Sequence, residues 1–154
     1  GLSSTTLVVG ASATLSLSAQ PVSFGNVNIV GADQSIMASP SPWRASDSRA
    51  SGGGWHVTLE STDLIATAGT IPVGQLKVQV KQSSITTVSG NAPPVSLVTS
   101  YQPLSVSPLK LIAAAPGNGM GTYDFTPEFQ LTLPASVYAG TYAASFTTSI
   151  NTGP

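Results

Sequence analysis

The stretch of sequence that decides the fold is LVVGASATLSLSA, residues 7–19, in which apolar and small polar residues alternate. Successive side chains of a β-strand point to opposite faces, so this period of two is typical of a half-buried strand. At about 3.3 Å per residue, one strand of this length would extend roughly 40 Å, about twice the usual strand length. The predicted apolar face consists of Leu7, Val9, Ala11, Ala13, Leu15, Leu17 and Ala19.

Two interpretations of this strand are open. In the first, it is a long edge or bridging strand within the chain's own sandwich, bent at Gly10. In the second, it is donated to a neighbouring copy, where main-chain hydrogen bonds give affinity and alternate side chains set the register. An unpaired apolar strand without Lys or Pro is an aggregation hazard, so we expect this one to be paired. The residues expected to contact the neighbour are Leu7, Val9, Ala11, Ala13, Leu15 and Leu17.

The composition is poor in charge. Of 154 residues, 41% are hydrophobic and only 7% are charged, with a formal net charge of −1. A typical globular domain has about 25% charged residues. Because little charge is left to keep a free monomer soluble, the composition favours a subunit of an assembly or a cell-surface protein. The richness in Ser and Thr likewise favours an extracellular localisation.

Several classes of partner are disfavoured by the residues that the chain lacks. Its five Lys and Arg residues are scattered, whereas nucleic-acid binding requires many cations on one face. The chain has no cysteine, which excludes disulfides, Cys-based zinc sites and thiol catalysis. No stretch approaches the roughly 18–20 apolar residues that span a bilayer, so we expect no membrane span.

Short alternating runs recur along the rest of the chain, separated by Gly, Pro, Asn and Ser, and helical periodicity is nearly absent. A change of parity within residues 22–29 predicts a strand with a bulge at Gly25 and Asn26. We therefore expect an all-β sandwich of about 8–10 strands with a long N-terminal strand. The predicted organisation is an N-terminal strand over residues 1–19 and one sandwich domain over residues 20–154.

Two pairs of motifs occur in order along the chain. The sequence DSR (residues 47–49) precedes GWHVTL (residues 54–59), and FQLTLP (residues 129–134) precedes YAGTY (residues 138–142). Together they resemble the proximal and distal halves of the WxL surface domain of Gram-positive bacteria, with Phe129 in place of the distal tryptophan. The resemblance covers about residues 24–150. It implies a secreted, β-rich domain that attaches noncovalently to peptidoglycan.

The YAGTY turn that leads into the last strand is also similar to pilin and fimbrial subunits. Those proteins share an immunoglobulin-like sandwich, and some of them exchange N-terminal strands. This second resemblance implies an immunoglobulin-like version of the predicted sandwich.

The aromatic residues divide into candidate core and candidate contact residues. Trp55, Phe129 and Tyr142 lie on alternating strands and are expected to anchor the core. Trp43, next to Arg44, is the candidate for an exposed ring that contacts glycan or cell wall, although packing of Trp43 beneath a loop is the simpler interpretation.

Charged and titratable residues give no catalytic constellation. Asp47 and Arg49 are two residues apart, which predicts an ion pair or a brace for the turn at residues 51–54. His56 is the only histidine, no Gly-x-Ser-x-Gly motif is present, and the carboxylates are scattered. Nucleophilic catalysis and zinc binding both require convergent sets of such residues. We therefore expect no enzyme activity, catalytic residue, metal site or cofactor.

The sequence thus favours a non-enzymatic extracellular structural protein. The expected role is that of a subunit in a self-assembling, pilus-like filament, joined by donation of the N-terminal strand, with further copies of itself as partners. The alternative is a cell-wall module that binds peptidoglycan or another glycan through Trp43, Arg44 and the turn at residues 51–54.

Overall fold

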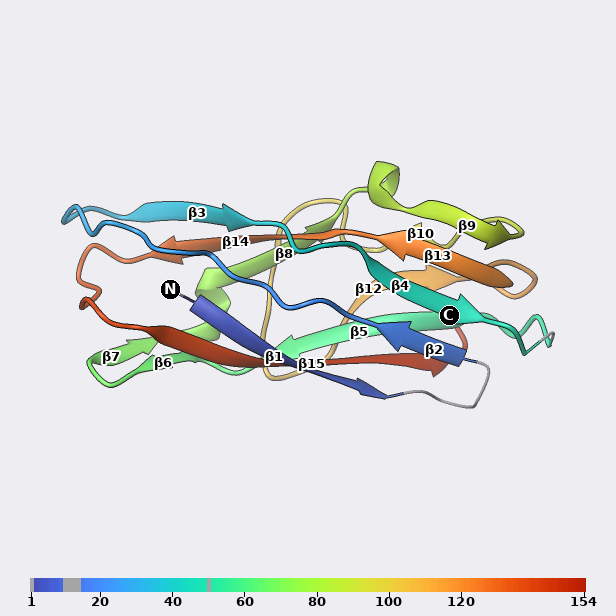
Figure 1. Ribbon diagram of the computed structural model, residues 1–154, viewed down its shortest axis with the longest axis horizontal. Coiled ribbons are helices and arrows are strands. Elements are labelled where there is room, and N and C mark those ends of the chain that lie inside the picture. The colour runs from blue at the N-terminus through green and yellow to red at the C-terminus, as the bar shows by residue number, and fades with distance from the viewer. Residues whose placement is uncertain (1, 10–14, 50) are drawn as a thin grey trace.

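The computed structural model describes residues 2–9, 15–49 and 51–154, and these are built mainly of β-strands that run along the long axis of the molecule (Figure 1). Helical structure in this part of the chain is confined to two 3₁₀ turns, η1 (Val73–Gln75) and η2 (Gln82–Ser84), on either side of one strand. The prediction of an all-β sandwich is confirmed.

One layer of the sandwich is a sheet with the strand order β10-β12-β5-β15-β6-β7, and β1 is added on β15. All of its pairings are antiparallel except that of β1 with β15, which is parallel. Its strands are β1 (Leu2–Val9), β5 (Trp55–Ser61), β6 (Leu64–Ala66), β7 (Gly69–Ile71), β10 (Val95–Ser96), β12 (Leu109–Ala114) and β15 (Tyr142–Thr152).

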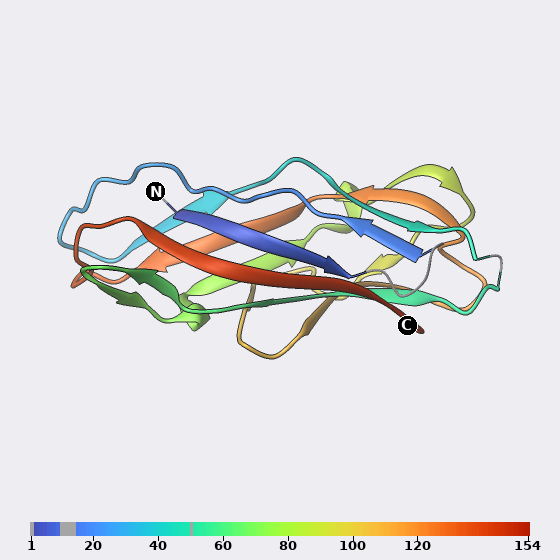
Figure 2. The same cartoon turned by 60° about the horizontal axis from the view of Figure 1, so that its bottom comes forward.

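Two smaller sheets lie end to end in the other layer, with strand orders β11-β8-β14-β3 and β2-β4-β13-β9 (Figures 1 and 2). They are continuous because only Thr126 separates β13 from β14. Their strands are β2 (Leu15–Ser18), β3 (Gln34–Ala38), β4 (Trp43–Asp47), β8 (Leu76–Val80), β9 (Thr86–Gly90), β11 (Gln102–Pro103), β13 (Gly121–Phe125) and β14 (Pro127–Leu133).

Aromatic side chains join the two layers across the core. Phe129 of β14 stacks on Phe146 of β15, with ring centroids 5.3 Å apart. Trp55 of β5 lies 6.3 Å from Tyr123 of β13. Strand β14 alternates strictly between buried and partly buried residues, as a strand with one face on the core must. The alternation seen in the sequence therefore identifies the inward face of this strand correctly.

The two described parts of the N-terminal run, β1 and β2, lie in different sheets of the same chain, which agrees with a bridging strand and not with one straight strand along a single sheet. β1 belongs to the larger sheet, whereas β2 pairs antiparallel with β4 in the opposite layer. Residues 10–14 between them lie outside the described residues. A continuous alternation fixes only which residues can share a face, so it cannot tell one long strand from two strands in different sheets.

Two further expectations are corrected. Residues 19–33 form no strand, and Gly25 and Gly31 within them take left-handed backbone conformations with φ of 70° and 72°. The described residues also contain fifteen strands, more than expected, because several of them are very short. β10 and β11, for example, have two residues each.

Candidate functional site

The edge of β15 that pairs with β1 is the first candidate site. β5 and β6 pair with one edge of β15, and β1 covers the other edge (Figure 2). The ladder between β1 and β15 is continuous, from Leu2 opposite Tyr142 to Val9 opposite Ser149. Removal of β1 would expose unpaired main-chain groups along most of β15, and such an edge accepts another strand readily.

Side chains reinforce β15 on its β5 side. The hydroxyl of Thr148, which is fully buried, donates to the Thr58 carbonyl oxygen over 2.7 Å. The hydroxyls of Thr58 and Ser149 lie 2.9 Å apart. A buried hydrogen bond costs more to break than an exposed one, because the freed groups are left without water. β15 is therefore anchored to the body of the sheet independently of β1.

Of the six predicted contact residues, the structure describes the side chains of Leu15 and Leu17. Leu15 and Leu17 lie in β2 and are buried in the chain's own core, 0% and 5% exposed. They are therefore not available for donation, because the pairing of β2 with β4 already uses them. Leu7 and Val9 lie in β1, and Ala11 and Ala13 lie outside the described residues.

The ladder between β1 and β15 sets which of their residues lie opposite each other. Leu7 and Val9 lie opposite Thr147 and Ser149, which are partly exposed. Two residues of β15 in this stretch are buried, Phe146 and Thr148. They lie opposite Thr6 and Val8, respectively. The predicted apolar positions of β1 are thus not aligned with the buried positions of β15.

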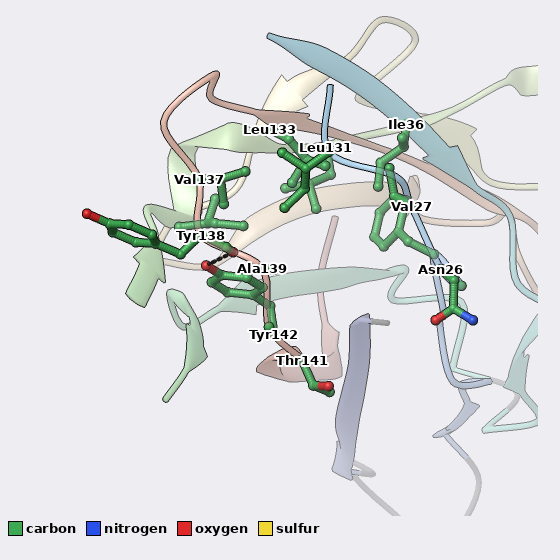
Figure 3. A pocket seen from close by; sticks show the side chains of 15 residues that line it. Asn26, Val27, Ile36, Leu131, Leu133, Val137, Tyr138, Ala139, Thr141 and Tyr142 are labelled. Atoms are coloured by element: carbon green, nitrogen blue, oxygen red, sulfur yellow. Dashed lines mark hydrogen bonds between the residues drawn. The ribbon is translucent and has the colours of Figure 1, made fainter. Parts of the chain in front are cut away.

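A second candidate site is a pocket at the end of the molecule that carries β3, β6 and β7 (Figure 3). We call this region the pocket end and define it by residues 19–33 and 134–141, of which residues 24–27, 29 and 137–141 line the pocket. The cavity has a volume of about 330 Å³. Buried Ile71, Leu131 and Leu133 line its base. The sequence analysis did not find this site, since residues 22–29 were expected to form a strand.

Trp43 does not provide an exposed ring, which corrects the predicted glycan contact. Its side chain is fully buried, its Nε1 donates to the Gln20 carbonyl oxygen over 3.1 Å, and it packs edge-on against Phe125. Trp43 begins β4 on the inward face, so the alternation of that strand places it in the core. Arg44 is exposed and forms a two-pronged pair with Asp124, at 2.7 and 3.0 Å. This hydrogen-bonded pairing raises the pKa of Arg44 and lowers that of Asp124.

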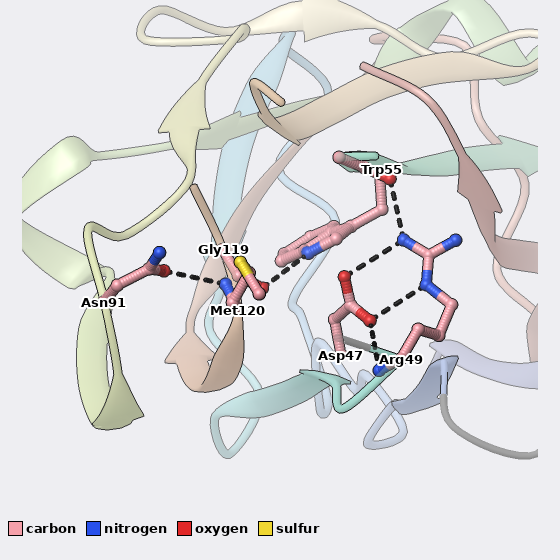
Figure 4. Close-up of polar contacts among 7 residues, drawn as sticks. Asp47, Arg49, Trp55, Asn91, Gly119 and Met120 are labelled. Atoms are coloured by element: carbon pink, nitrogen blue, oxygen red, sulfur yellow. Dashed lines mark hydrogen bonds and ion pairs between the residues drawn. The ribbon is translucent and has the colours of Figure 1, made fainter. Parts of the chain in front are cut away.

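Asp47 and Arg49 form the predicted ion pair and brace the following turn (Figure 4). The Arg49 Nε and Nη2 atoms donate to the two Asp47 carboxylate oxygens at 2.9 and 3.0 Å, and Nη2 also donates to the Gly54 carbonyl oxygen at 2.8 Å. The side chain of Asp47 is buried. These hydrogen bonds from Arg49 favour the charged carboxylate and lower the pKa of Asp47.

The three predicted core anchors, Trp55, Phe129 and Tyr142, are buried. Trp55 is held by a hydrogen bond from its Nε1 to the Gly119 carbonyl oxygen, 2.9 Å long (Figure 4). A Cβ atom at position 119 would lie 2.8 Å from this same nitrogen, so the ring requires glycine there. Sequence reasoning missed this contact, because the partners are 64 positions apart in the sequence and give no local signal.

Asn91 organises the loops beside Trp55. Its side-chain oxygen accepts a hydrogen bond from the Met120 main-chain N–H at 2.8 Å, and its side-chain nitrogen donates to the Gly117 carbonyl oxygen. The buried Tyr123 hydroxyl donates to the Asn91 carbonyl oxygen at 3.0 Å. Burial raises the pKa of Tyr123. We call this region, with Trp43, Trp55, Tyr123 and Phe125 at its centre, the aromatic half.

The remaining titratable residue of interest is His56. Its Nδ1 atom lies 2.7 Å from the carbonyl oxygen of Gly153, the residue that follows β15, so the ring does not point only into solvent. Within the described residues, no three His, Cys, Asp or Glu side chains gather in a way that could hold a metal ion. The described part of the chain has no helix long and apolar enough to cross a bilayer.

The chain was compared with protein families, curated proteins and solved structures, and only the solved structures gave a match. The chain matches no protein-family model. No curated protein is detectably similar to it. Among solved structures, it is similar to part of a family 123 glycoside hydrolase from Clostridium perfringens, whose structural analysis concerned glycolipid glycan hydrolysis, with a TM-score of 0.37 and 13% sequence identity. The match covers 79% of this chain and 19% of the hydrolase chain.

Proposed function

We propose that this protein is a non-enzymatic, extracellular structural subunit that assembles with further copies of itself by exchange of strand β1. The observation that supports the proposal is the position of β1: its pairing is with one edge of β15, while β5 and β6 hold the other edge. The same edge in another copy offers the same main-chain partners. Exchange therefore replaces a ladder within one chain by an equivalent ladder between two chains.

Of the two strands in the N-terminal run, only β1 is exchanged between chains. β2 remains in its own chain, because Leu15 and Leu17 are part of the core. β1 contributes main-chain pairing along β15. The donated element is therefore residues 2–9, shorter than the element expected from the sequence.

Chain length limits the geometry of the assembly. Five residues of sequence separate β1 from β2, and an extended chain spans at most about 3.3–3.6 Å per residue. β1 can thus reach only a neighbour whose β15 edge lies within about 20 Å of the donor's β2. Reciprocal exchange would close a dimer, whereas donation in one direction would continue as a filament. We propose the second case, which the low content of charged residues supports.

Disulfide trapping tests the proposal, because the natural chain has no cysteine. Thr5 lies opposite Ser145 in the ladder, and Ser145 is exposed. Chains with Thr5→Cys and chains with Ser145→Cys, distinguished by isotope labelling, are unfolded together in reducing buffer, refolded and then oxidised. Exchange predicts covalent pairs between the two kinds of chain, joined at residues 5 and 145 as read by mass spectrometry of the cross-linked peptides.

The control pairs Thr5→Cys with Ser89→Cys, since Ser89 is also exposed but lies in β9, the edge strand of a sheet in the other layer. This mixture should give few cross-links. The double variant Thr5→Cys/Ser145→Cys tests the alternative, in which β1 pairs only with β15 of its own chain. If it yields only monomers with an internal disulfide at every protein concentration, and the mixture of single variants yields no linked pairs, strand exchange is wrong.

Electron microscopy of the purified protein separates a filament from a closed dimer. Filaments in the parent chain, and their loss when residues 1–12 are deleted, would support donation in one direction. Discrete dimers would retain strand exchange but exclude the filament. Filaments that persist after the deletion would contradict the role of β1.

A further inference from the structure

We propose that the pocket between residues 19–33 and 134–141 is a binding site for an uncharged, mainly apolar ring compound. This inference goes beyond the proposed assembly and does not depend on strand exchange. The cavity of about 330 Å³ lies at the lower end of the ~300–1,000 Å³ range of small-molecule sites. The size fits a small ligand better than a folded partner.

The lining of the pocket excludes ions. Fifteen described residues line it, and none of them is Asp, Glu, Lys, Arg or His (Figure 3). An ionised ligand would lose its hydration there without meeting an opposite charge, which carries a large free-energy cost. The absence of charge from the lining therefore selects neutral ligands.

Aromatic and aliphatic side chains select an apolar body. Phe24, Tyr138 and Tyr142 line the pocket together with Val27 and aliphatic residues of its base. Aromatic rings prefer offset or edge-on contact with other rings. The Tyr142 hydroxyl donates to the Tyr138 carbonyl oxygen at 2.7 Å, so its oxygen still has capacity to accept one hydrogen bond from a ligand.

The pocket lining includes two large apolar side chains that are exposed. Ile29 is 44% exposed and Tyr138 is 69% exposed, although both side chains are large. The two segments that carry them contain no strand, so they offer no strand edge along which a peptide could add by main-chain pairing. A compact ligand that covers both side chains would gain the free energy of burying apolar surface.

Titration with N-phenyl-1-naphthylamine, an uncharged fluorescent ring compound, tests the proposal on the full chain. We expect saturable binding with one probe per chain. The anion 8-anilinonaphthalene-1-sulfonate has a similar ring system and should bind at least about tenfold more weakly. Absence of saturable binding of the neutral probe, or equal binding of both probes, would overturn the assignment.

A matched pair of variants locates the bound probe. Val27 lines the pocket, whereas Val30 lies three residues further along the same segment, is exposed and does not line it. Val27→Trp fills the cavity and should raise the Kd for the neutral probe at least about tenfold, while Val30→Trp should leave it within about twofold. Equal effects of the two substitutions would show that the probe binds elsewhere.

A measurement on the unaltered chain keeps the inference testable if Val27→Trp does not fold. Amide chemical shifts in an ¹⁵N-labelled sample are followed as the neutral probe is added. Changes concentrated at residues 24–29 and 137–142 would support the site. Changes concentrated instead at other exposed apolar residues, such as Val95, Leu97 and Val106, would indicate nonspecific adsorption and contradict it.

Discussion

The aromatic half and the pocket end are built from the same charge-poor sequence, yet they meet their packing requirements differently. In the aromatic half, Trp43 and Trp55 are fully buried, and each indole N–H has a carbonyl partner within the chain. At the pocket end, Ile29 and Tyr138 remain exposed around a cavity. The comparison indicates that one region is a self-contained scaffold and the other has apolar surface available for a ligand.

The polar groups differ in the same sense. Asp47 is buried and receives hydrogen bonds from the side chain and the main-chain N–H of Arg49. The carboxylate at the pocket end, Asp33, accepts a hydrogen bond from the Ala135 N–H but is exposed. A polar group that loses its hydrogen-bond partner lowers the stability of the fold more when it is buried than when it is exposed. Substitutions should therefore reduce the free energy of unfolding strongly in the aromatic half and only slightly at the pocket end.

The largest expected effect is that of Trp55→Ala. Removing a fully buried indole and its hydrogen bond to Gly119 should lower the free energy of unfolding by about 4 kcal/mol. Tyr138→Ala removes a ring that is 69% exposed and should change it by less than about 0.5 kcal/mol. Urea unfolding followed by tryptophan fluorescence from Trp43, or by circular dichroism, measures both. Equal losses would contradict the distinction between the two regions.

Asp47→Asn should have the next largest effect. It leaves the Arg49 guanidinium, whose side chain is 13% exposed, without its charge partner, and breaking a buried pair on one side costs about 3 kcal/mol. Asp33→Asn is the control at the pocket end. Its amide oxygen can still accept the hydrogen bond from Ala135 in an exposed position, so the urea midpoint should hardly change. The comparison fails if Asp33→Asn is the more damaging substitution.

A pair of glycines separates backbone strain from crowding. Gly54 and Gly25 have similar φ values, 77° and 70°. A Cβ atom at Gly54 would meet the Ala114 carbonyl oxygen at 2.4 Å, whereas nothing lies within 4 Å of one at Gly25. Left-handed backbone costs a non-glycine residue about 1 kcal/mol, and crowding should make Gly54→Ala costlier than Gly25→Ala by about 2 kcal/mol. Similar thermal stabilities of the two variants would show that position 54 can relax.

The smallest expected effect concerns pH. Because Arg49 lowers the pKa of Asp47 below its ordinary 3.8, the folded chain keeps the carboxylate charged where the unfolded chain protonates it. Its stabilising contribution is thus complete above pH 3.8 and is lost as the pH falls through the lower, folded-state pKa. Urea titrations from pH 6 to pH 2 should show a steeper loss of stability in the parent than in Asp47→Asn. Parallel curves would exclude this linkage.

Local patterns predicted much of the scaffold. Strict alternation identified the inward faces of β5, β14 and β15, and hence the buried positions of Trp55, Phe129 and Tyr142. Asp47 and Arg49 are at positions i and i+2, and this spacing was enough to predict their ion pair. These features depend on neighbours in sequence, so periodicity and spacing carry the information.

Other features depend on distant partners. The sequence pattern offered Trp43 as a candidate for exposure, but its burial depends on Gln20 and Phe125. The pocket requires two segments that are about a hundred residues apart and form no strands. No local pattern encodes such meetings, because they arise only when the two layers pack.

The alternating run at residues 7–19 shows where this boundary lies. The sequence by itself determined that the chain is an all-β protein and that residues 7–9 and 15–18 of this run are extended. Only the tertiary structure decided that residues 2–9 pair with β15, that residues 15–18 pair with β4, and which positions of each strand lie opposite buried partners. The physical reason is that alternation follows from the geometry of one strand, whereas register and sheet membership follow from which distant strand edges are left to be paired.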